Sequence, residues 1–85
     1  MAPPRSYRCE ALTLRKTPLG EADLMVTLYT RDQGKLRVLA RGARRTSSRL
    51  VGHFEPLTQV RLSLAQGRNL DYVSQAQVIG TFAPL

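Results

Sequence analysis

The chain has 85 residues, 42% of them hydrophobic, and its 13 lysines and arginines against 6 aspartates and glutamates give a formal net charge of +7. This length suits one domain with a modest core, and this composition argues against global disorder. No apolar run approaches the roughly 20 residues that cross a bilayer. No secretory leader follows Met1, and a single cysteine, Cys9, excludes an internal disulfide and a cysteine-rich zinc site. We therefore expect a protein of the cytoplasm.

Alternating polarity predicts an all-β chain. Residues 1–6 hold two prolines and no periodic pattern, so we expect a flexible N-terminus ahead of a single domain over residues 7–85. Five strands are expected within that domain, most of them separated by turns that contain glycine. They cover residues 7–16, 23–31, 35–42, 58–64 and 70–82.

The strands differ in the composition of their faces. In the first strand, Leu12 and Leu14 share one face. Thr13 and Arg15 share the other. In the second and third strands one face is apolar and is expected to fill the interior: Leu24, Val26, Leu28, Leu36, Val38 and Ala40. The third strand also fits helical spacing, but the turn before it and its flanking glycines favour a strand.

Residues 43–56 break the two-residue period between the third and fourth strands. We expect a short helix or an irregular segment here. A helix would begin at a hydroxyl cap provided by Thr46, Ser47 or Ser48. Its apolar side chains would plug the barrel: Leu50, Val51 and Phe54.

Five strands with such a segment after the third are typical of the oligonucleotide-binding (OB) fold, a small Greek-key barrel. An SH3-like barrel is the alternative that the same pattern allows. Ligands of an OB fold bind across the second and third strands and at the loops that join strand one to two and strand four to five. In this chain, the third strand and the segment after it are strongly basic.

Residues 32–34, Asp-Gln-Gly, are predicted to turn the chain between the second and third strands, with Gly34 in the left-handed region. If Arg31 and Lys35 flank this turn, antiparallel pairing fixes the partners on the outer side of the hairpin. The expected pairs are Tyr29 with Arg37 and Met25 with Arg41. Cations that follow a nucleic-acid backbone, beside a ring on which bases stack, are typical of single-strand binding. The alternative is a cation–π pair of Tyr29 and Arg37 with no ligand.

Six basic residues and no acidic one lie between Gly34 and Leu50: Lys35, Arg37, Arg41, Arg44, Arg45 and Arg49. The planar fork of arginine matches phosphate oxygens. Cations gathered in this way repel one another unless an anion lies among them. We predict that these six residues, together with Tyr29, contact a nucleic acid. The alternatives are a solvated face, an acidic protein and an anionic membrane surface.

The residues that catalysis or metal binding requires are scarce. His53 is the single histidine, which excludes a metal site built from several histidines. Glu21 and Asp23 lie two residues apart at a turn, where such carboxylates more often accept backbone N–H groups or pair with arginines. Cys9 is expected to pack as a small apolar residue. We expect no catalytic residue, no metal and no cofactor, so the chain is predicted not to be an enzyme.

The chain contains, in this order, the segments EALTLRKTPLGEADLMVTLYT, GKLRVLARGARRTSSRL, FEPLT and QAQV. Together they resemble the N-terminal domain of the RecO family of bacterial recombination mediators, over about residues 10–82. The most specific parts are the turn with Pro18, Gly20, Glu21 and Asp23, the VTLYT strand, and the GKL…ARGARR…SRL run.

The resemblance implies an OB-fold domain that binds single- and double-stranded DNA in repair and recombination, in the cytoplasm at the nucleoid. The resemblance places DNA contacts on the six basic residues between Gly34 and Leu50 as a group. Family members act with the partner protein RecR and with single-strand-binding protein. Docking of an acidic partner, RecR or the tail of single-strand-binding protein, is therefore the alternative function, and an RNA-binding barrel of the translation machinery is a third. Family members continue into a helical domain that often carries a four-cysteine zinc site. This chain ends at Leu85, so we carry neither zinc nor strand annealing over to it.

Overall fold

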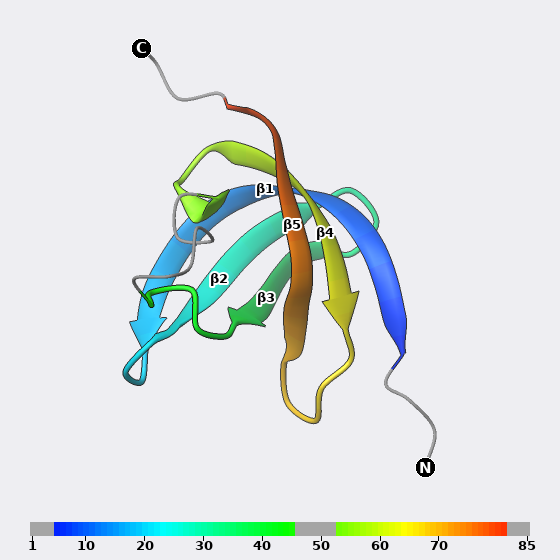
Figure 1. Ribbon diagram of the computed structural model, residues 1–85. Helices are drawn as coiled ribbons and strands as arrows, with labels where there is room; N and C mark the ends of the chain where they lie inside the picture. Colours follow the sequence, from blue (N-terminus) through cyan, green and yellow to red (C-terminus); the bar gives the residue numbers. More distant parts are fainter. Residues whose placement is uncertain (1–4, 46–52, 82–85) are drawn as a thin grey trace.

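Five strands close into one barrel in the computed structural model, which describes residues 5–45 and 53–81 (Figure 1). The strands are β1 (Ser6–Leu19), β2 (Asp23–Thr30), β3 (Gly34–Ala40), β4 (Thr58–Ala65) and β5 (Asp71–Thr81). Their order around the barrel is β1-β2-β3-β5-β4, and β4 pairs with β1 to close it. The β3–β5 contact is parallel and every other pair is antiparallel. The chain therefore has the five-stranded OB-fold barrel that its sequence predicts.

The barrel interior is filled by side chains from alternate positions of β2, β3 and β4. The predicted inner faces of the second and third strands are confirmed, with Leu36 partly buried. Among the largest fully buried side chains are Phe54, Leu28, Leu62, Leu64, Val26, Val38 and Val60. Successive residues of a strand point to opposite sides, so alternation collects these side chains on the inner face. The helical alternative for the third strand is wrong, because β3 lies between β2 and β5 in the sheet.

β1 is a long curved strand that pairs with a different neighbour along each of its halves (Figure 1). Its first half pairs with β4 and its second half with β2. The register with β2 shifts between Thr13 and Arg15, which makes Leu14 the extra residue of a β-bulge. The predicted faces of this strand are therefore wrong. Ala11 and Thr13 point inward and are 4% and 0% exposed, whereas Leu14 is 37% exposed.

The connection between β3 and β4 is described in two parts, residues 41–45 and residues 53–57. Both consist of turns and bends, with one short 3₁₀ turn at residues 53–54. Phe54 is 0% exposed, which confirms that it belongs to the core. The other residues of the expected cap and plug lie outside the described residues: Thr46, Ser47, Ser48, Leu50 and Val51. In the described part of the chain, no helix has the length and apolar composition to cross a membrane.

Candidate nucleic-acid interface

Strand register aligns side chains in three rows on the outer surface of β1, β2 and β3, which we call the outer face. Residues paired across antiparallel strands point to the same side of a sheet, so each row crosses all three strands. The rows are Leu12–Tyr29–Lys35, Arg15–Thr27–Arg37 and Thr17–Met25–Leu39. Three cations and a tyrosine therefore share one surface.

The β2–β3 hairpin closes one residue earlier than predicted. Thr30 pairs with Gly34, so residues 31–33 form the turn and Gly34 begins β3 with a φ of 66°. The Thr30 hydroxyl fixes this closure, because it accepts the N–H of Gln33 at 3.0 Å and donates to the carbonyl of Gly34 at 2.9 Å. The left-handed glycine is confirmed.

The cross-strand pairs of the hairpin differ from the predicted ones for this reason. Tyr29 lies opposite Lys35 instead of Arg37. Met25 lies opposite Leu39, and Arg41 falls beyond the end of β3. A shift of two residues leaves each side chain on the same side of the sheet. The predicted pairs are therefore wrong, while the composition of the two faces is confirmed.

Arg15 reaches the outer face through the bulge in β1, and the sequence prediction omits it. Strict alternation from the inward Thr13 would send Arg15 inward as well. The extra residue, Leu14, reverses that alternation and places Arg15 opposite Thr27, whose partner on β3 is Arg37. Two guanidinium groups consequently stand on either side of Thr27.

The ring of Tyr29 is open to a ligand. Tyr29 is 56% exposed. Among the described residues, the one cation–ring contact joins Arg41 to Tyr72, with the guanidinium carbon 4.6 Å from the ring centroid. The alternative cation–π pair of Tyr29 and Arg37 is therefore not formed in the described part of the chain.

Arg41 is held beside the end of β3 by a residue from a distant part of the sequence. Leu39 and Tyr72 are paired in the parallel contact of β3 with β5, which brings the tyrosine ring under the Arg41 guanidinium. Such a contact contributes about 0.5–1 kcal/mol at an exposed site and restricts the arginine to fewer orientations. The sequence prediction omits Tyr72, because the contact joins two strands that are far apart in the chain.

The basic loop, residues 41–45, rests on the turn between β1 and β2. The Gly42 N–H donates to Asp23 Oδ1 at 2.7 Å. The Arg44 guanidinium donates to the carbonyl of Gly20 at 3.2 Å. Asp23 therefore binds backbone, as its position at a turn suggests, and it fixes the start of the loop beside the third row of the outer face.

The predicted basic contacts fall into three groups. Lys35 and Arg37 are exposed on the outer face. Arg41, Arg44 and Arg45 are exposed in the basic loop. Arg49 lies outside the described residues. Contact of these residues and Tyr29 with a ligand stays a prediction, to which the outer face adds Arg15.

No carboxylate offsets the positive charge of the outer face. None of its three rows contains an acidic residue. The two ion pairs of the described residues lie elsewhere: Lys16 with Glu55 at 2.7 Å, and Arg61 with Glu10 at 3.1 Å. A surface with charges of one sign attracts a polyanion and raises its rate of association.

Among the described residues, two titratable side chains have perturbed pKa values, and both belong to the barrel. Burial, reinforced by a hydrogen bond to Asp71, raises the pKa of Tyr7 well above its ordinary value. Burial also raises the pKa of the Cys9 thiol, which packs against the core as predicted. Both groups are therefore neutral at physiological pH. Within residues 5–45 and 53–81, no three His, Cys, Asp or Glu side chains gather as metal ligands would.

Residues 1–82 match the sequence profile of a family described as Recombination protein O N terminal. The chain is also similar to curated proteins named DNA repair protein RecO. That of Nocardioides sp. is 52% identical over 77 residues, which cover 91% of this chain and 32% of the relative. That of Bifidobacterium adolescentis is 52% identical over 77 residues, covering 91% and 31%. That of Heliobacterium modesticaldum is 47% identical over 81 residues, covering 95% and 30%. The chain thus spans about a third of the length of these relatives.

Proposed function

Because the chain belongs to the family of recombination protein O N-terminal domains, we propose that it is a non-catalytic DNA-binding module of a recombination mediator in DNA repair. It contacts single- and double-stranded DNA through the outer face and the basic loop. The observation that carries this proposal is the convergence of Arg15, Lys35 and Arg37 around an exposed Tyr29 on a surface without carboxylates.

The chemistry of the outer face fits a nucleic-acid backbone. Each guanidinium or ammonium group that neutralises a phosphate releases a condensed counterion, and this release favours binding. An exposed ring among these cations gives an unpaired base a surface on which to stack. A duplex offers its phosphates to the same cations, while its bases already stack on one another.

The test of this function is a titration of labelled single-stranded DNA, duplex DNA and RNA of equal length at two salt concentrations. We expect both forms of DNA to bind, and to bind more weakly at the higher salt concentration. RecR and single-strand-binding protein are the partners we propose for a longer protein that contains this domain. A domain that binds purified RecR but no DNA at low salt would favour the acidic-partner alternative. A preference for RNA would favour recognition of the 2′-hydroxyl.

DNA binding is expected to be nearly independent of base sequence. The proposed contacts are cations that reach phosphates and a ring that stacks, and neither distinguishes one base from another by hydrogen bonding. Mixed-sequence oligonucleotides of equal length, measured at the same salt concentration, should have affinities within a few-fold of each other. A hundredfold preference for one sequence would contradict phosphate and stacking contacts as the source of affinity.

Replacing Tyr29 with leucine should weaken binding to a single strand more than binding to a duplex. Stacking on an aromatic side chain contributes about 1–3 kcal/mol per base, and leucine has no ring. The measurement is a pair of titrations, with single-stranded and duplex oligonucleotides. The matched control, Tyr29→Phe, keeps the ring and should bind like the wild type. Equal losses on both substrates would show that Tyr29 supports the surface without stacking on a base.

A further inference from the structure

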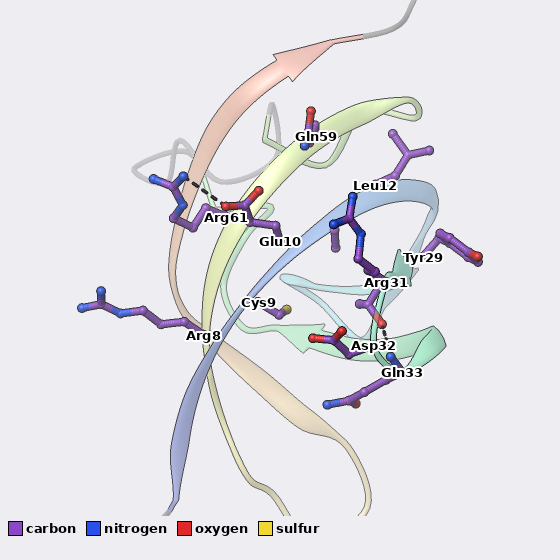
Figure 2. Close-up of a pocket in the computed structure, with 12 residues that line it drawn as sticks. Arg8, Cys9, Glu10, Leu12, Tyr29, Arg31, Asp32, Gln33, Gln59 and Arg61 are labelled. Atoms are coloured by element: carbon purple, nitrogen blue, oxygen red, sulfur yellow. Dashed lines mark hydrogen bonds and ion pairs between the residues drawn. The ribbon is translucent and has the colours of Figure 1, made fainter.

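A hollow of about 960 Å³ adjoins the outer face, between the first half of β1, the start of β4 and the β2–β3 turn (Figure 2). Tyr29 and Leu12 line this hollow and also form part of the first row of the outer face. The two surfaces are therefore continuous. In Figure 2, Arg31 projects over the hollow from the turn, and the ring of Tyr29 points away from its centre.

The far side of the hollow is formed by Arg8 on β1 and Arg61 on β4. The same two residues line a second hollow of about 530 Å³ over β4 and β5. Their guanidinium groups consequently stand on a ridge between the hollows. The polar side chains beside them in the second hollow are uncharged: Ser63, Gln75 and Gln77.

Among the described residues, two of the three cations along this path have unpaired side chains, and one of the two carboxylates near them is already paired. The guanidinium groups of Arg8 and Arg31 form no hydrogen bond or ion pair with any residue of 5–45 or 53–81. Of the two carboxylates in the first hollow, Glu10 is bound by Arg61 at 3.1 Å. Asp32 is exposed at the tip of the turn.

We propose that a single strand bound on the outer face continues past Tyr29 into the first hollow, where its phosphates contact Arg31 and then the ridge of Arg8 and Arg61. This inference rests on the DNA-binding function proposed above, and it lengthens the site. From Leu12 to Arg8 is four residues of β1, or about 13 Å at about 3.3 Å per residue. A strand that covers the outer face alone therefore does not reach the ridge.

The path around the barrel suits a single strand and excludes a duplex. Double-stranded DNA has a persistence length of about 150 base pairs, so a short duplex stays straight across the barrel. A single strand has no such stiffness and can follow the curved surface. The contribution of Arg8 and Arg31 should consequently depend on both the length and the strandedness of the DNA.

The test compares the DNA affinities of the wild type and the variant Arg8→Ala/Arg31→Ala. The substrates are a 6-nucleotide strand, a 20-nucleotide strand and a 20-base-pair duplex. One OB fold occupies ~4–16 nucleotides, so the two strand lengths lie near the lower end of this range and above it. On the longer strand, the loss of two phosphate contacts should make the slope of log affinity against log salt shallower by about 1.4, which is about 25-fold in affinity at 0.1 M salt. On the 6-nucleotide strand and on the duplex, affinity should match the wild type.

Two further variants serve as controls. Arg5→Ala/Lys16→Ala removes the same charge from residues that line neither hollow, and it should show no dependence on length. Arg8→Lys/Arg31→Lys keeps both charges and should retain most of the affinity. Both arginines are exposed, so the fold should survive their replacement, as a thermal melt will check.

The outcomes separate this inference from the function on which it rests. Binding of the 6-nucleotide strand by the wild type tests the outer face alone. If that binding occurs and the Arg8→Ala/Arg31→Ala variant loses nothing on the longer strand, or loses equally on all three DNAs, the extended path is wrong and the proposed function stands. If the wild type binds no DNA, the proposed function itself is wrong.

Discussion

Replacing Arg15, Lys35 and Arg37 together with alanine is expected to lower affinity for a 6-nucleotide single strand about a hundredfold at 0.1 M salt. Each phosphate contact on a single strand contributes about 0.7 to the slope of log affinity against log salt, so the loss of three makes the slope shallower by about 2. The three side chains lie on adjacent strands of one surface. The measurement is a series of titrations with a fluorescent oligonucleotide over several salt concentrations.

The control for this experiment removes positive charge from a different part of the barrel. Arg5→Ala/Lys16→Ala leaves the three rows of the outer face intact, so its salt slope should stay close to that of the wild type. All three substituted residues of the test variant are exposed, and surface changes of this kind usually alter stability by less than about 0.5 kcal/mol. A folded triple variant with an unchanged salt slope would assign the phosphate contacts to the basic loop instead.

The strands of the barrel are predictable wherever the hydrophobic period is regular. In β2, Leu24, Val26 and Leu28 alternate with more polar neighbours, and all three are at most 2% exposed. A one-residue slip would move this whole set to solvent, so the pattern fixes which face is inside. The positions of Tyr29 and Lys35 on the outer face follow from the same parity and need no structure.

In the first strand, alternation of polarity does not predict which side chains point inward. The two leucines of this strand are expected on one face and Thr13 with Arg15 on the other, yet the inner positions are Ala11 and Thr13, and Leu14 is the extra residue of the bulge. The Thr13 hydroxyl is fully buried and has no hydrogen-bond partner among the described residues. Burying it without a partner is unfavourable by about 1–3 kcal/mol. Packing of the whole barrel decides this register, and no short segment of sequence contains that information.

The candidate site is predictable in part for the same reason. Local alternation identifies the outer side chains of the hairpin, but the Thr30 hydroxyl sets which of them are paired. Arg15 depends on the bulge in β1, and Tyr72 depends on a parallel contact between strands far apart in the chain. Both residues join the candidate site through contacts of the complete barrel, so the local sequence around them does not predict their positions.

Replacing Phe54 with alanine is expected to lower the free energy of unfolding by about 3–5 kcal/mol, the range for a buried phenylalanine. Phe54 is 0% exposed and packs in the main hydrophobic cluster with side chains from several strands. A domain of 85 residues has a total stability of about 4–13 kcal/mol at about 0.05–0.15 kcal/mol per residue. The substitution should therefore remove between about a quarter and the whole of the total stability.

Urea unfolding of Phe54→Ala, Phe54→Leu and Leu19→Ala tests this expectation. Leucine keeps much of the ring's volume, so Phe54→Leu should lose less stability than the alanine variant and remain folded. Leu19 is 40% exposed, and its replacement should change stability by less than about 0.5 kcal/mol. A loss below about 1 kcal/mol for Phe54→Ala would contradict a core role.

Because Phe54 contacts no solvent, folded Phe54→Leu should bind DNA with the wild-type salt slope. If folded Phe54→Leu has a shallower slope, the packing of Phe54 in the core helps to position the basic loop.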